Sequence, residues 1–190
     1  MSRQPAHDIR AIAGEFDLLG EFLGAEPYGS GHINDTYRLT FQQAGVPVRY
    51  ILQWINHKIF RNPGALMENV QRVTEHLAAK VKGQIDASRR VLTLVPTRSG
   101  RGWHVDSDGN HWRVYLFIEK GRTFDAVESP GQAFTHNDTK FNNVILDEAT
   151  GEGLCVIDLD TVMPGLALYD FGDRCWSSRR CEGRWPVGTT

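Results

Sequence analysis

Apolar residues recur along the chain with two different periods, and each period predicts a different kind of element. A period of three to four residues predicts an amphipathic helix over residues 7–23. The same period predicts a second helix, which begins at Asn62-Pro63 with Asn as N-cap and ends at Gly83. The apolar face of the first helix would consist of Ile9, Ile12, Phe16, Leu19 and Leu23.

Runs rich in β-branched and aromatic residues predict strands, which we expect to form a five-stranded antiparallel sheet. Residues 106–110, Asp-Ser-Asp-Gly-Asn, resemble a calcium loop, but Gly stands fourth and no Glu stands twelfth. They are therefore predicted to be a hairpin turn. The predicted strands cover residues 37–41, 48–55, 91–95, 103–105 and 111–118.

Later in the chain, two apolar runs flank an Asp-, Glu- and Gly-rich turn at residues 147–153, which predicts a β-hairpin. Polar residues border both runs. Before the first run stands H-x-D-x-x-x-x-N, from His136 through Asp138 to Asn143, and the second run ends in I-D-x-D at Asp158. A hairpin would hold these side chains on one rigid unit.

These residue types suit phosphoryl transfer. Asp138 could accept the proton of an attacking hydroxyl, and Asn143 and Asp158 could hold Mg²⁺ through oxygen atoms. Lys140 could contact the transferred phosphate, although a solvated loop lysine is an equal alternative. A surface hairpin with solvated acids is disfavoured, because two motifs coincide at kinase-like spacing. Asp170, in Asp-Phe-Gly, lies 32 residues after Asp138, so the metal is assigned to Asp158 instead.

Near the N-terminus, Gly29-Ser30-Gly31 separates two predicted strands. Such a turn lets backbone N–H groups approach an anion closely, which suits nucleotide phosphates. Glycine-rich hairpins are common, so this turn is weak support by itself. The polar residues His32, Asn34 and Thr36 follow the turn directly.

Composition narrows the class of partner. A formal charge of −2 gives no reason to propose nucleic acid or a membrane surface. No apolar run approaches the roughly 20 residues of a membrane span, and the polar N-terminus does not read as a signal peptide. Three Cys without metal-ligand spacing favour a reducing, cytoplasmic location, with Cys155 in the core.

Five segments together resemble the aminoglycoside phosphotransferase and choline kinase superfamily, and most closely the N-acetylhexosamine 1-kinases. The resemblance implies an α+β, protein-kinase-like fold with a truncated C-lobe. Its parts would be an N-lobe at 1–118, a hinge and shortened connection at 119–134, a catalytic part at 135–173 and an atypical tail at 174–190. The segments that carry the resemblance are residues 29–36, 52–56, 112–119, 136–143 and 156–165.

The resemblance implies ATP- and Mg²⁺-dependent phosphorylation of the anomeric hydroxyl of N-acetylglucosamine or N-acetylgalactosamine. Asp138 would be the base, and Asn143 and Asp158 the metal ligands. Gln53 would replace the usual lysine of the third strand, and the Glu119 segment would be the hinge whose backbone meets adenine. Alternative acceptors are an aminoglycoside, choline or homoserine, and a non-catalytic remnant is a third possibility. The predicted phosphate-facing residues are Gly29, Ser30, Gly31, His32, Asn34 and Thr36.

The chain also departs from the family pattern. Trp54 stands where the family would place Arg beside Gln53. Glu68 and Glu75, in the second helix, could orient Gln53, although solvated acids are favoured. Residues 120–135 are too few for the long helices that a kinase-like fold places there, and the tail lacks an amphipathic period. We therefore expect an incomplete or out-of-frame copy with weak activity or none.

Overall fold

The computed structural model describes residues 7–29, 33–123, 138 and 143–162. The chain divides into two compact units, Met1–Glu119 and Lys120–Thr190. Within the described residues, no helix is both long and apolar enough to cross a membrane.

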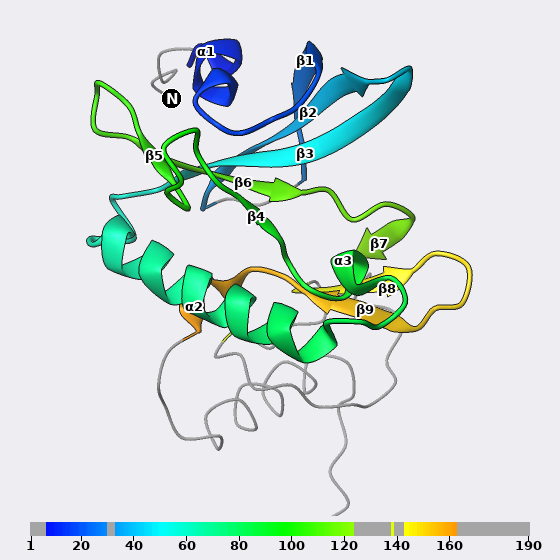
Figure 1. Ribbon diagram of the computed structural model, residues 1–190. Coiled ribbons are helices and arrows are strands. Elements are labelled where there is room, and N and C mark those ends of the chain that lie inside the picture. The colour runs from blue at the N-terminus through cyan, green and yellow to red at the C-terminus, as the bar shows by residue number, and fades with distance from the viewer. Residues whose placement is uncertain (1–6, 30–32, 124–137, 139–142, 163–190) are drawn as a thin grey trace, which may run out of the picture. The chain divides into compact units, whose positions relative to one another are not determined.

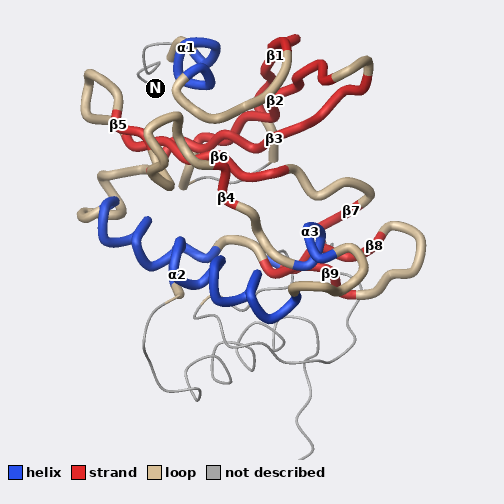
Figure 2. The backbone as a smooth tube through the Cα atoms, viewed as in Figure 1, coloured by secondary structure: helices blue, strands red, loops and turns tan. Residues whose placement is uncertain are grey.

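The first unit is organised around an antiparallel sheet (Figures 1 and 2). The strand order is β1-β2-β3-β6-β4, and β5 also pairs with β6, so the sheet has six strands rather than the expected five. The additional strand is β1, which none of the expected strands covers, whereas β5 lies within the strand expected at residues 103–105. The strands are β1 (Glu21–Pro27), β2 (Asp35–Gln43), β3 (Val46–Ile55), β4 (Leu94–Val95), β5 (His104–Val105) and β6 (His111–Leu116).

The prediction of one long helix over residues 7–23 is wrong for the second half of that range. Helix α1 spans only Ile9–Gly14, capped by the Asp8 carboxylate on the Ala11 N–H, and β1 begins at Glu21. Leu19 and Leu23, expected on the buried helix face, are 67% and 53% exposed. Pairing with β2 therefore decides the structure here, against a helical period in the sequence.

The core of this unit lies on one face of the sheet, beneath α1. Residues that alternate along β2, β3 and β6 point to this face, because successive side chains of a strand point to opposite faces. Ile12, Ala13 and Phe16 pack against them from α1 and its C-terminal extension. The strand residues in this core are Leu39, Phe41, Tyr50, Leu52, Trp54, Trp112 and Val114.

The other face of the sheet is more polar, and helix α2 packs on it. Helix α2 spans Pro63–Val81, with the expected Asn62 N-cap accepting from the Ala65 N–H. Its buried residues are Pro63, Met67, Val70 and Thr74. The Met67 sulfur accepts from Nη1 of Arg113 in β6, at 3.8 Å. A short helix, α3 (Ala87–Arg90), follows α2.

Two turns set the registers of the hairpins. Ala44 and Gly45 join β2 to β3, and both have positive φ, 46° and 85°. Positive φ at both central residues defines the type I′ turn, whose twist matches that of the strands. In the β5–β6 hairpin, the Asp106 carboxylate accepts from the backbone N–H groups of Asp108 and Asn110 and from the indole of Trp112. These donors confirm a hairpin turn at residues 106–110.

The second unit contains the expected hairpin. Strand β8 (Val144–Asp147) pairs antiparallel with β9 (Gly153–Val156), and Leu159–Thr161 form a 3-10 turn, η2. Cys155 is buried in β9, as expected. A third strand, β7 (Gly121–Thr123), pairs with β8. These residues fall in the shortened connection expected over residues 119–134, and a strand of three residues is too short to show a period in the sequence.

Candidate active site

The polar residues expected at the start of the hairpin lie together. Asn143 immediately precedes β8 and is 5% exposed. Its Nδ2 donates to the Oδ2 of Asp138 at 3.1 Å and to the backbone carbonyl oxygen of Asp138 at 3.0 Å. One buried amide therefore fixes both the main chain and the carboxylate of Asp138. Lys140 lies outside the described residues.

Asp158 is brought to this end of the hairpin by the pairing of β8 and β9. The N–H of Ile157 donates to the backbone oxygen of Asn143 at 2.8 Å, so Asp158 follows directly after a residue bonded to Asn143. Asp158 has φ 60° and ψ 54°, a left-handed conformation. Such a conformation is uncommon outside Gly and least costly for Asn and Asp. The backbone here thus turns sharply just after the strand.

The donor chemistry of these residues fits a hard divalent cation. Mg²⁺ prefers oxygen ligands and is held by one or two protein groups together with water and phosphate oxygens. Asn143 contributes an amide oxygen and Asp158 a carboxylate. Within the described ranges, no three His, Cys, Asp or Glu side chains gather in a way that would hold a metal. A cation bound at this hairpin would therefore be coordinated by the side-chain oxygens of Asn143 and Asp158 and by phosphate oxygens of a bound substrate.

In the first unit, the glycine-rich turn lies between β1 and β2, as expected. Gly29 has φ 82°, a conformation that favours glycine. The Asn34 side-chain oxygen accepts from the N–H of Asn56 at 3.0 Å, and the Asn56 amide donates to the Ile33 carbonyl, also at 3.0 Å. These bonds tie the end of the turn to the segment after β3. Ser30, Gly31 and His32 lie outside the described residues.

A row of polar side chains crosses the sheet next to this turn. Thr36 pairs with Gln53, and Gln53 pairs with Arg113, so all three point to the same face. Gln53 donates through Nε2 to the Thr36 hydroxyl at 3.0 Å and accepts from Nε of Arg113 at 3.0 Å. Trp54, the departure noted in the sequence, points to the opposite face and donates to Asn110 at 3.1 Å. It therefore does not share the face of Gln53.

Arg113 is the residue of this row that sequence reasoning missed. An arginine stands between Trp112 and Val114 in an otherwise apolar strand, and this was the available signal. That Arg113 faces Gln53 could not be predicted without knowing the register in which β3 pairs with β6. Glu68 and Glu75 are exposed, and Glu75 accepts from Gln71 of the same helix. The exposure of Glu68 and Glu75 agrees with the favoured prediction that they are solvated acids on the helix surface.

Glu119 ends the first unit and is held by two arginines. Its carboxylate forms an ion pair with Arg49 of β3, whose Nε lies 2.8 Å from Oε1, and this hydrogen bond raises the pKa of Arg49. Its backbone carbonyl accepts from Nε of Arg89 in α3 at 3.1 Å. The Arg49 guanidinium also lies over the Phe117 ring, 4.6 Å from the centroid. The predicted role of this segment at adenine stays a prediction.

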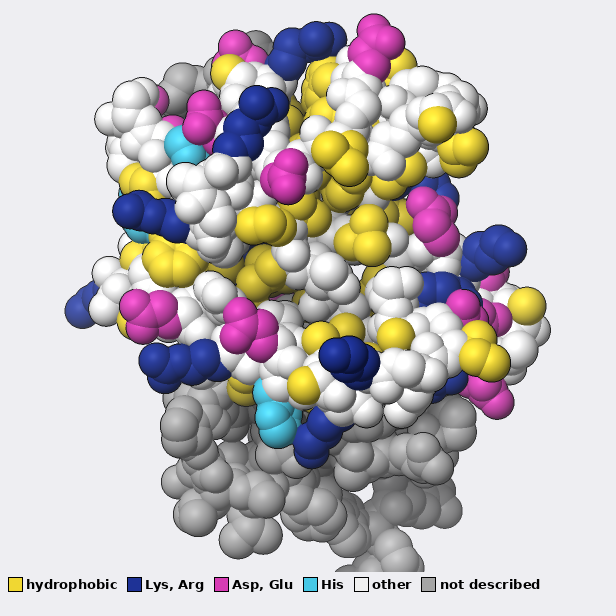
Figure 3. Space-filling model, viewed as in Figure 1, with side chains coloured by type: hydrophobic (Ala, Val, Ile, Leu, Met, Phe, Trp, Pro, Cys, Tyr) yellow, Lys and Arg dark blue, Asp and Glu magenta, His cyan; other side chains and the backbone are white. Residues whose placement is uncertain are grey.

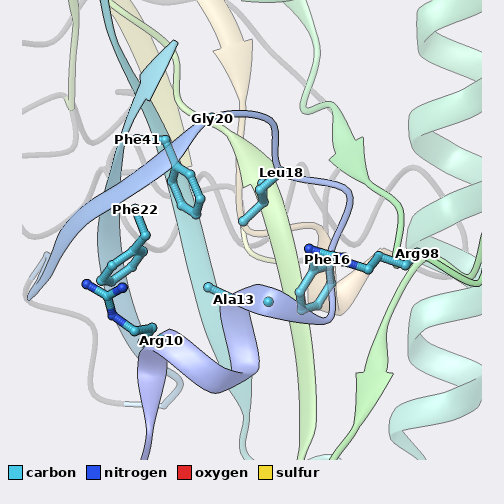
Figure 4. Close-up of a pocket in the computed structure, with 9 residues that line it drawn as sticks. Arg10, Ala13, Phe16, Leu18, Gly20, Phe22, Phe41 and Arg98 are labelled. Carbon is cyan, nitrogen blue, oxygen red and sulfur yellow. The ribbon is translucent and has the colours of Figure 1, made fainter.

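A hollow of about 200 Å³ lies elsewhere in the first unit, between α1, β1 and β2 (Figure 4). Phe22 and Phe41 line it, and Arg10 lies over the Phe22 ring, 4.6 Å from its centroid. Phe41 belongs to the core face beneath α1, so the hollow and Gln53 lie on opposite faces of the sheet. On the molecular face in Figure 3, Lys and Arg side chains are scattered among acids rather than gathered into one patch.

One protein-family model matches the part of the chain that contains the hairpin. The family model for APH, the phosphotransferase enzyme family, matches residues 121–186, about a third of the chain. The matched range contains Asp138, Asn143 and Asp158. The match supports a relationship with the aminoglycoside phosphotransferase and choline kinase superfamily. It also suggests a kinase-type phosphotransferase with a protein-kinase-like fold.

Proposed function

We propose that this chain is an ATP- and Mg²⁺-dependent kinase that phosphorylates a sugar hydroxyl, with the anomeric hydroxyl of N-acetylhexosamine as the first acceptor to test. The observation that carries the proposal is the contact between the Asn143 amide and the Asp138 carboxylate. This contact lies within the segment that matches the phosphotransferase family. The acceptor itself rests on the sequence resemblance alone.

In this proposal, Asp138 is the general base. As the acceptor oxygen bonds to the γ-phosphorus, its O–H bond breaks and the proton passes to the Asp138 carboxylate. The bond between the γ-phosphorus and the bridging oxygen breaks, and ADP leaves with that oxygen. Asn143 holds the carboxylate in one orientation, which matters because positioning supplies most of the catalysis in phosphoryl transfer.

Asn143 and Asp158 would hold Mg²⁺ in this proposal. The bound cation would neutralise the charge of the phosphates. The residues next to the glycine-rich turn, Thr36 and Gln53, would face the nucleotide phosphates from the first unit. Gln53 can donate an amide hydrogen bond to a phosphate oxygen, but it brings no charge.

The test is phosphoryl transfer by the purified chain with ATP and Mg²⁺. Acceptors are N-acetylglucosamine, N-acetylgalactosamine, an aminoglycoside, choline and homoserine, each assayed for ADP release and for the phosphorylated product by mass spectrometry. We expect product with an N-acetylhexosamine at a turnover below the ordinary kinase range of about 1–100 per second. The short connection at residues 120–135 is the reason for this low expectation.

Two variants control the assay. Asp138→Asn removes the base at nearly constant shape and should abolish transfer. Glu148→Gln removes a carboxylate in the exposed hairpin turn and should leave transfer unchanged. Product with choline, homoserine or an aminoglycoside alone would move the assignment to that acceptor. If no acceptor yields more product than Asp138→Asn does, the kinase proposal is wrong.

A further inference from the structure

The hollow between α1, β1 and β2 has an apolar inner wall and a cationic rim. Ala13, Phe16 and Phe41, which are all buried, line its inner part. Arg10 and Arg98 also line it and are exposed, whereas none of its nine lining residues is acidic. Ligand sites typically combine apolar walls with a few polar groups. This hollow therefore suits a ligand that is apolar at one end and anionic at the other.

The two arginines reach the hollow from separate segments of the first unit. Arg10 lies in α1, and its guanidinium carbon is 4.6 Å from the centroid of the Phe22 ring. Arg98 lies in the loop after β4. This loop is attached to the end of α1, because the Arg98 N–H donates to the Glu15 carbonyl oxygen at 2.9 Å. In Figure 4, Arg98 extends toward Phe16 and Arg10 lies beside Phe22, so the two cations flank the aromatic residues.

The guanidinium of Arg98 is available for a ligand. Within the part of the chain that the structure describes, it forms no hydrogen bond or ion pair. The carboxylate of Glu15, whose carbonyl holds the Arg98 main chain, lies instead 4.0 Å from Nδ1 of His104. A guanidinium presents a planar fork of N–H donors that matches a carboxylate. Arg98 can therefore bind an anion without losing an existing partner.

Gly14 leaves the hollow open at the end of α1. A Cβ placed on Gly14 would meet no atom of another segment within 4 Å. Its φ is not positive, so the backbone does not require a glycine here. Gly20, also in the lining, differs, because it has φ 100° and a Cβ there would clash with the Gln42 carbonyl oxygen. The open space at Gly14 therefore has no cause in the backbone conformation.

The size of the hollow and its rings narrow the class of ligand. Its volume is about 200 Å³. An apolar cavity of roughly 150 Å³ can hold benzene, so one ring with a short acidic chain fits here. Phe22 and Phe41 meet edge to face, with ring centroids 5.4 Å apart and planes at 83°. A third aromatic ring can extend this favourable arrangement.

We propose that the hollow binds a small aromatic carboxylate, whose ring lies against Phe22 and Phe41 and whose carboxylate is bound by Arg98. Arg10, which lies over the Phe22 ring, forms the opposite rim of the site. The hollow and Gln53 lie on opposite faces of the sheet, so this inference does not rest on the proposed kinase activity. The alternative is a water-filled depression with two hydrated arginines. The two readings differ in whether an aromatic carboxylate binds and whether its charge matters.

The experiment measures the binding of 3-phenylpropionate to the purified chain by ¹H–¹⁵N NMR titration. We expect a Kd on the order of 1 mM, because so small a ligand gains little free energy, with shifts of the Gly14 and Gly20 N–H signals. The neutral 3-phenylpropanamide should bind about 10-fold more weakly, since it lacks the charge that Arg98 binds. Arg98→Gln should weaken binding of the carboxylate about 10-fold and leave binding of the amide unchanged.

Two further variants separate this site from a general effect of charge. Gly14→Leu places a side chain in the hollow and should remove binding of both compounds. Gly14 is exposed and Leu favours a helix more than Gly does, so this variant should fold, which circular dichroism checks. Arg101→Gln makes the same charge change in the same loop, at an exposed residue that does not line the hollow, and should leave binding unchanged.

Three results would each overturn the inference. The first is the absence of shifts at Gly14 and Gly20 with 3-phenylpropionate at about 10 mM, well above the expected Kd. The second is equal affinity of the carboxylate for wild type and Arg98→Gln. The third is undiminished binding by folded Gly14→Leu, which would place the ligand elsewhere.

Discussion

The Asn143 amide donates to the Asp138 carboxylate across five positions of the chain, at 3.1 Å. The same nitrogen also donates to the Asp138 main-chain oxygen, and Asn143 is itself buried against the hairpin. The candidate base is thereby attached to β8. In phosphoryl transfer such attachment has direct consequences, because misplacing a reacting group by about 1 Å can cost on the order of a hundredfold in rate.

Replacing Asn143 should therefore affect transfer more than folding. For Asn143→Ala, we expect phosphoryl transfer at least about a hundredfold slower than wild type, since the orientation of Asp138 and the proposed oxygen ligand for Mg²⁺ are both lost. Asn143→Asp should also be slow, because it places a second carboxylate beside Asp138. Product formation under saturating MgATP measures both. Wild-type rates in folded Asn143→Ala would show that Asp138 needs no such support.

At Asp158, the backbone and the charge can be tested separately. Asp158→Asn keeps a residue type that tolerates φ 60°, so we expect little backbone strain but weaker Mg²⁺ dependence of nucleotide binding. Asp158→Val adds a β-branched side chain at positive φ and should lower the free energy of unfolding by about 1–3 kcal/mol. Urea unfolding and titration with Mg²⁺ separate the two effects. Equal Mg²⁺ dependence in wild type and Asp158→Asn would remove Asp158 from the metal site.

The β2–β3 turn offers a stabilising substitution. Ala44 has φ 46°, which costs alanine roughly 1 kcal/mol or more, whereas Asn is favoured at this position of a type I′ turn. We expect Ala44→Asn to raise the free energy of unfolding by about 0.5–1 kcal/mol. Ala44→Val should lower it, since β-branched residues tolerate positive φ poorly. Thermal unfolding of both variants measures the effect. Destabilisation by Ala44→Asn together with stabilisation by Ala44→Val would refute the assigned turn type.

Acid should weaken the β5–β6 hairpin through Asp106. Burial raises the pKa of Asp106, but hydrogen bonds from Trp112, Asn110 and Asp108 outweigh it, so the pKa is lowered. A carboxyl with a lowered folded pKa stabilises the fold above its unfolded pKa of about 3.9, and this contribution is lost as pH falls through the folded value. At pH 6, the wild type should therefore have a higher melting temperature than Asp106→Asn. The difference between the two melting temperatures should disappear below pH of about 4. A gap independent of pH would contradict this assignment.

Local chemistry explains which elements the sequence alone determined. The Asn62-Pro63 start of α2, the hairpin turn at residues 106–110 and the two strands around residues 147–153 depend on neighbouring residues, so their patterns are sufficient. The contact between Asp138 and Asn143 also spans only five residues. A short local segment brings these side chains together without any long-range pairing.

The tertiary structure decided whatever depended on pairing between distant segments. Residues 21–27 carry part of a helical period, yet they form β1 because they pair with β2 along most of their length. The meeting of Gln53 with Arg113 joins residues 60 positions apart. Its basis is the register of β3 on β6, and a slip of one residue would place Arg113 on the apolar face beneath α1. Sequence showed an arginine in an apolar strand, and only the sheet showed which glutamine it faces.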